Sequence, residues 1–245
     1  MRVFALAAYG AACHTASMVS LLVLFGWLGG YAWLPIRLDG EAGSSLGPAL
    51  AWNTAIMVGF GLYHSIFART AVKERTRVFV GRNLERATYN LVSAVLSVLM
   101  CVAWRALPQR LWEVPSPAAA QAVQIAYVLL WVVHMTSIVL MNYNDFFGLR
   151  QIRLAIRGEE YRPLPSVSKA YYLWTRLALV ISLALIPWAS PIMSVGRLQL
   201  GVFMTFYVAL GAWLSNRDPG DVQTLPASAF AESAVVAASR SAPRA

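Results

Sequence analysis

The sequence predicts an all-α integral membrane protein, built as a bundle of about six transmembrane helices. Of its 245 residues, 58% are hydrophobic and only 13% are charged, whereas soluble domains average about 25% charged. The apolar residues form long runs, of the length that an α-helix needs to cross a bilayer. The net charge of +9 lies mainly in short segments between these runs. Membrane topology therefore explains the basic excess, so we expect the lipid bilayer as a partner and no nucleic acid.

The first three predicted spans cover residues 3–33, 48–68 and 87–107. The first run is too long for the apolar core of a signal peptide and has no cleavage site, so we expect a retained span. A polar segment with a single basic residue, Arg37, follows it. A strongly basic segment, residues 69–86, separates the second span from the third. We interpret that segment as a cytoplasmic loop.

The last three predicted spans cover residues 118–142, 171–190 and 192–214. In the segment before the fifth span, apolar residues alternate with arginines, which predicts an amphipathic helix on the bilayer surface. Pro187 and Pro191 predict a kinked hairpin with a tight turn between the last two spans, because proline stops or bends helices. Residues 215–245 are rich in alanine and serine, and we expect a low-complexity cytoplasmic tail there.

Basic residues alternate between the two sides of the predicted bundle. The segments 69–86 and 143–170 contain six and five of them, and Arg2 and Arg217 fall on the same side. The opposite side has Arg37, Arg105, Arg110 and Arg197. Loops rich in lysine and arginine remain on the cytoplasmic side. We therefore predict a multi-pass protein of the cell inner membrane with both termini in the cytoplasm.

Four blocks of the sequence resemble the membrane-bound methanethiol S-methyltransferase family, which is related to the isoprenylcysteine carboxyl methyltransferases. The blocks read GLYHSIFARTAVKERTRVFVGRNLERATYNLVSAVL, MNYNDFFGLRQIRLAIRGEEYRPLP, WASPIMSVGRL and ALGAWLSNRD. Together they extend the resemblance over residues 45–218. It implies a helical membrane fold and the use of S-adenosylmethionine as methyl donor.

The resemblance also implies where the cofactor would be held, and the sequence departs from the family there. The Arg-His-Pro-x-Tyr-x-Gly motif falls on residues 176–182, of which only Arg176 matches. The Glu-Glu-Arg-Asp motif retains Arg217 and Asp218, but Ser215 and Asn216 replace both glutamates. A buried site for this cofactor needs acidic groups that accept from its ammonium. We therefore predict that the cofactor site is lost and that the protein has an accessory or structural role in a membrane complex.

Other polar residues cluster at the predicted cytoplasmic ends of the spans. His64 ends the second span, Asp145 ends the fourth, and Arg150 and Gln151 follow it. With Arg176, Arg217 and Asp218 they form the candidate cofactor-binding set, in which no catalytic residue can be assigned. The alternative for His64 and Asp145 is that they pair with each other or cap helix ends.

Two further functions remain open. The first is an active S-adenosylmethionine-dependent methyltransferase that acts on a small thiol or a lipophilic acceptor. The second is a haem or pigment protein, because His14 and His134 are expected at similar depths in their helices. No ligand-spacing motif supports that role, and Cys13 and Cys101 both lie inside apolar runs. We therefore expect no disulfide and no metal site.

Overall fold

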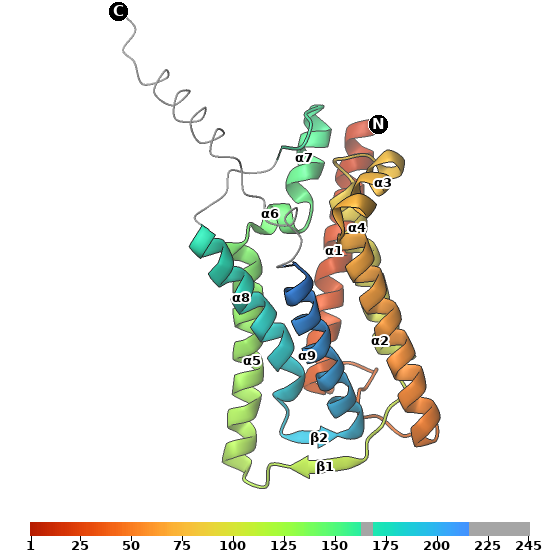
Figure 1. Cartoon of the computed structure of the whole chain (residues 1–245), viewed down its shortest axis with the longest axis vertical. Coiled ribbons are helices and arrows are strands. Elements are labelled where there is room, and N and C mark those ends of the chain that lie inside the picture. The colour runs from red at the N-terminus through yellow and green to blue at the C-terminus, as the bar shows by residue number, and fades with distance from the viewer. Residues whose placement is uncertain (163–168, 216–245) are drawn as a thin grey trace, which may run out of the picture.

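The computed structural model describes residues 1–162 and 169–215. Its long helices are α1 (Arg2–Gly29), α2 (Leu46–Ala68), α4 (Glu85–Ala103), α5 (Pro117–Leu140), α8 (Lys169–Leu185) and α9 (Val195–Ser215). The shorter elements are α3 (Thr70–Val80), α6 (Tyr143–Phe146), α7 (Leu149–Arg157), a 3-10 turn (Ile186–Trp188), β1 (Arg110–Glu113) and β2 (Ile192–Ser194). Figure 1 shows the long helices running side by side. The predicted tail beyond Ser215, with Arg217 and Asp218, lies outside the described residues.

The all-α membrane class is confirmed, and each of the six predicted spans corresponds to a long helix. Among the described residues, α1, α4, α5 and α9 are each long and apolar enough to cross a bilayer. A fifth candidate is the pair α2 and α3, which is bent by 82°. The apolar stretch Leu173–Trp188, which contains most of α8, is shorter. The count of six spans stays a prediction.

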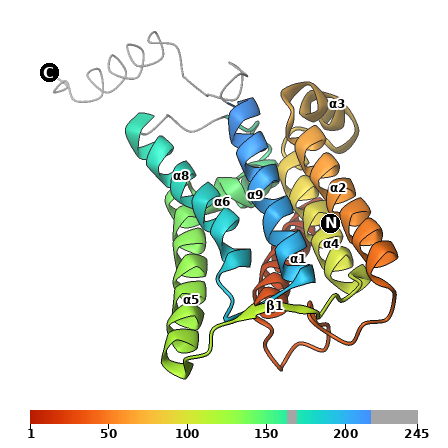
Figure 2. The ribbon, with the colours of Figure 1, turned by 60° about the horizontal axis from the view of Figure 1, so that its bottom comes forward.

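The helices form two packed groups with α9 between them. In one group α1 packs against α4, and in the other α5 packs against α8, while α9 lies between α8 and α2 (Figures 1 and 2). Small residues allow neighbouring helices to pack closely. The ring of Tyr207 packs against Gly61, and the side chain of Ile152 packs against Gly10. Aliphatic residues on the outer faces, such as Leu99, are exposed. A surface of this kind is suited to lipid.

The elements differ from the predicted boundaries at five places, and one of them is α8, which ends at Leu185 although the fifth span was predicted to reach residue 190. The first helix ends at Gly29 because Gly30 adopts a left-handed conformation, with φ 67°. The third span was predicted to reach residue 107, but α4 ends at Ala103. The basic segment interpreted as a loop contains α3. Residues 192–194, predicted to open the last span, form β2, which pairs antiparallel with β1.

An ion pair joins the loop after α1 to the first turn of α9, at the end of the bundle that carries β1 and β2. The Arg197 Nε donates to the Asp39 carboxylate over 2.5 Å, and its NH1 donates to the Leu28 carbonyl over 2.7 Å. The Ser194 hydroxyl donates to the same carboxylate. This cluster fastens the start of α9 to the loop that follows α1.

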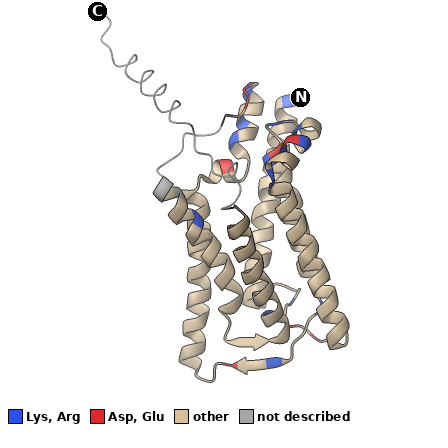
Figure 3. Ribbon diagram, viewed as in Figure 1, with Lys and Arg blue, Asp and Glu red and all other residues tan. Residues whose placement is uncertain are grey.

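Basic side chains are concentrated at the opposite end, where α3 and α7 lie (Figure 3). Val78 and Phe79, at the end of α3, are 82% and 87% exposed, as expected for a helix at a membrane surface. The predicted orientation makes this the cytoplasmic end.

Reporter fusions after Gly43 and after Gly81 are expected to report opposite sides of the membrane. The same side for both would contradict the topology.

Candidate functional site

A cavity of about 550 Å³ lies between α1, α2, α4, α5, α8 and α9. It is the size of a typical small-molecule pocket. Its lining along α4 runs from Arg86 to Ser97, which corresponds to a depth of roughly 16 Å at the rise of an α-helix. Two candidate residues from the sequence, His64 and Arg176, line it. Of the other candidates within the described residues, Asp145, Arg150 and Gln151 do not.

Three arginines line the end of the cavity nearest α3 and α6. Arg69 caps the C-terminus of α2, Arg86 belongs to the first turn of α4, and Arg176 lies two turns into α8. The Arg86 Nε donates to the Phe146 carbonyl over 2.9 Å, and its guanidinium carbon lies 5.6 Å from the centre of the Tyr89 ring and 5.3 Å from that of the Phe146 ring. Arg176 forms no hydrogen bond or ion pair with any described residue. No aspartate or glutamate within the described chain lines the cavity.

His64 is held in place by aromatic neighbours. Its Nδ1 lies 2.9 Å from the Tyr89 hydroxyl, and its ring stacks on Phe60 at 5.8 Å between centroids. It is therefore not paired with Asp145, as one alternative from the sequence suggested. Its partner Tyr89 comes from α4, so this hydrogen bond joins two walls of the cavity.

The deep end of the cavity is lined by Leu21, Leu24 and Leu183, with a few hydroxyl groups among them. The hydroxyls of Ser17, Ser20 and Ser97 each donate to a backbone carbonyl one turn earlier in the same helix, over 2.8 to 2.9 Å. Their donors are therefore already used. The deep end therefore offers a ligand a mainly apolar surface, whereas the mouth is cationic.

The two histidines considered as haem ligands have separate partners. The His14 Nε2 lies 3.1 Å from the Tyr143 hydroxyl, and the His134 Nδ1 lies 3.2 Å from the Ser182 hydroxyl. Of these two histidines, His134 lines the cavity and His14 does not. Within the part of the chain that the structure describes, no group of three histidine, cysteine or acidic residues is placed to hold a metal ion.

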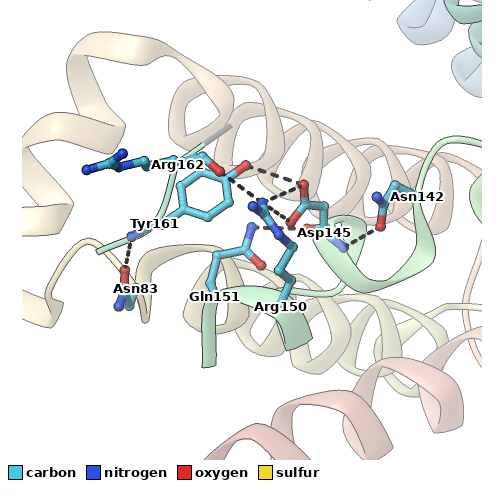
Figure 4. Close-up of polar contacts among 7 residues, drawn as sticks. All are labelled: Asn83, Asn142, Asp145, Arg150, Gln151, Tyr161 and Arg162. Carbon is cyan, nitrogen blue, oxygen red and sulfur yellow. Dashed lines mark hydrogen bonds and ion pairs between the residues drawn. The ribbon is translucent and has the colours of Figure 1, made fainter. Parts of the chain in front are cut away.

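Asp145, Arg150 and Gln151 belong to a polar network beside the cavity (Figure 4). The Arg150 NH1 lies 3.3 Å from the Asp145 carboxylate, and the Gln151 side chain donates to the Asp145 carbonyl over 3.4 Å. Asn142 caps α6 by accepting from the Asp145 backbone N–H over 3.2 Å. These residues lie together at the end of the bundle, and the charges of Asp145 and Arg150 are paired with each other.

Tyr161 connects this network to the loop before α4. Its hydroxyl donates to the Asp145 carboxylate over 3.5 Å, and its backbone N–H donates to the Asn83 side chain over 3.0 Å. Burial raises the pKa of the Tyr161 phenol, and the Asp145 charge raises it further. The phenol therefore remains a protonated donor at neutral pH. The Asp145 carboxylate is satisfied by Arg150 and Tyr161 and is not directed at the cavity.

One polar face of α4 lines the cavity and was not predicted from the sequence. Arg86, Asn90, Ser93 and Ser97 all line the cavity. Their spacing puts them on one face of an otherwise apolar helix. A polar stripe within a predicted span indicates an internal cavity or a packed interior, and this signal was available in the sequence.

Comparison with known proteins found relatives over most of the chain. A protein of Mycobacterium tuberculosis named methanethiol S-methyltransferase is 30% identical over 210 residues, which cover 86% of each chain. Methanethiol S-methyltransferase 1 of Bradyrhizobium diazoefficiens is also 30% identical, over 86% of this chain and 73% of its own. Nurim of Rattus norvegicus is 27% identical over 86% of this chain and 84% of its own. No family model and no solved structure matches the chain.

Proposed function

Because the chain belongs to the membrane family that contains the methanethiol S-methyltransferases and nurim, we propose that it retains the family's helical frame without its S-adenosylmethionine site. In this proposal the protein has an accessory or structural role in a complex of the inner membrane, with both termini in the cytoplasm. The cationic mouth of the cavity, lined by three arginines and by no described carboxylate, carries this proposal.

Charge is the reason that this mouth does not suit the cofactor. S-adenosylmethionine presents a carboxylate, an ammonium and a sulfonium, so its net charge is positive. Arg176 can pair with the carboxylate, but the ammonium and the sulfonium would face the Arg86 guanidinium at the same mouth. An uncompensated charge in a buried site costs several kcal/mol. Millimolar affinity corresponds to about 4 kcal/mol of binding free energy. A repulsion of several kcal/mol is of the same size and is therefore large enough to abolish binding.

Calorimetric titration tests the proposal directly. The detergent-purified protein is expected to show no binding of S-adenosylmethionine at millimolar concentration and no methylation of methanethiol. The combined variant Leu177→His, Ala178→Pro, Ser215→Glu and Asn216→Glu is expected to gain weak binding, because it restores the groups of the two family motifs. The matched control adds Arg176→Ala to this variant and is expected to lose the gain.

Active methyl transfer is the second candidate, and the names of the bacterial relatives favour it. In that case the substrate would be a small thiol or a lipophilic acceptor, and S-adenosylmethionine would be the donor. Micromolar binding by the unmodified chain would replace the first proposal with this one. Acidic groups other than the two lost glutamates would then have to accept from the ammonium.

A further inference from the structure

The central cavity changes character along its depth. Arg69, Arg86 and Arg176 line the end near α3 and α6, and the leucines of α1 and α8 line the other end. The serine hydroxyls at the deep end donate to their own helices. The cavity therefore offers positive charge at its mouth and an apolar surface inside. A ligand that matches both parts has an acidic group at one end and a hydrocarbon chain at the other.

Arg176 is the best evidence that the mouth is suited to an anion. It forms no hydrogen bond or ion pair with any described residue, although it lies on a helix with apolar neighbours such as Leu177 and Leu179. An unpaired guanidinium at a membrane edge is costly unless it reaches water or an anion. The acids nearest in sequence to the mouth are engaged elsewhere, Glu85 with Arg77 at 3.4 Å and Asp145 with Arg150 at 3.3 Å.

We propose that this cavity binds an amphiphile with a single acidic head group, a carboxylate or a phosphate, whose head contacts Arg176 and Arg86 and whose hydrocarbon chain extends toward Leu24 and Leu183. The depth of roughly 16 Å along α4 accommodates a medium-length chain. The inference rests on the proposed function in one respect, namely that S-adenosylmethionine does not occupy the same mouth.

Binding of radiolabelled laurate to the tagged protein on scintillation beads, in neutral detergent, tests the proposal. Laurate is expected to bind, its uncharged methyl ester is expected to compete poorly, and hexanoate is expected to bind at least tenfold more weakly because it buries less hydrocarbon. Inorganic phosphate is expected not to compete at millimolar concentration. Competition by phosphate as strong as that by laurate would reduce the site to a simple anion site and overturn the proposal.

Arg176→Gln is the informative variant, because within residues 1–162 and 169–215 the native side chain has no hydrogen-bond or ion-pair partner whose loss would disturb the fold. We expect it to weaken laurate binding roughly tenfold, the effect of losing one charge-assisted hydrogen bond. Arg153→Gln is the matched control, since Arg153 is an exposed arginine of α7 that does not line the cavity. Equal affinity in the wild type and Arg176→Gln, or equal binding of laurate and its ester, would overturn the proposal.

Titration of the same preparation with S-adenosylmethionine separates this inference from the proposed function. If neither ligand binds, the inference fails and the proposed loss of the cofactor site stands. If S-adenosylmethionine binds without displacing laurate, and laurate binding still depends on Arg176, the proposed function fails and the amphiphile site stands.

Discussion

Asp39→Ala is expected to lower the free energy of unfolding by about 3 kcal/mol, because it leaves the buried Arg197 guanidinium without its counter-ion. The Arg197 side chain is only 8% exposed, and Asp39 accepts from both Arg197 and Ser194. In a thermal melt we expect Tm to fall by about 5–10 °C. A thiol-reactive dye can follow the transition, because the free thiols of Cys13 and Cys101 are buried.

Two further variants show whether the ion pair itself is responsible. Glu41→Ala removes an exposed acid from the same loop and is expected to leave Tm unchanged. Arg197→Met in the Asp39→Ala background is expected to recover part of the loss, because the uncompensated charge is removed with its partner. An Asp39→Ala protein that melts at the wild-type temperature would show that water satisfies Arg197 in the folded state.

Gly148→Ala is expected to destabilise the protein by about 3 kcal/mol through two separate effects. Gly148 has a φ of 78°, which an L-residue adopts only with strain. A Cβ at this position would also lie 2.8 Å from the backbone nitrogen of Ala87 in α4. The backbone of α4 cannot yield as a flexible side chain can, so α7 would have to move away from the bundle.

Gly158→Ala isolates the two effects, since Gly158 has a similar φ of 74° but nothing within 4 Å of an added Cβ. It is expected to cost about 1 kcal/mol, from backbone strain alone. The measurement is the difference in Tm between the two variants by the same dye assay. Equal losses would mean that the contact between Gly148 and α4 contributes nothing.

Long apolar runs were sufficient to locate the six long helices, because a helix that faces lipid needs little beyond length and hydrophobicity. The helix boundaries depended on local features that composition does not reveal. The left-handed Gly30 ends α1 before Trp33, although the apolar run continues. The bend at Arg69 and the helix α3 were hidden within a segment whose charges predicted only its side of the membrane.

The candidate site was predictable only in part. His64 and Arg176 both line the cavity, and the sequence had placed both near one end of the bundle. Asp145 and Arg150 lie near the same end but bind each other. Linear spacing gives the depth of a side chain along its helix but not the direction in which it points around the bundle. The facing residues of α4 and α2, such as Tyr89 with His64, become evident only when the helices are packed.

The ribbon formed by β1 and β2 also bears on the order in which the chain can assemble. Arg110 pairs with Ser194, so α5 and α8 are both synthesised between the two partners. At cellular rates of translation, the roughly 80 intervening residues require on the order of ten seconds. During that time β1 has an open hydrogen-bonding edge, which is a general liability of unpaired strands. The ribbon therefore closes late, after β2 has been synthesised, and it joins two segments that are made far apart in time.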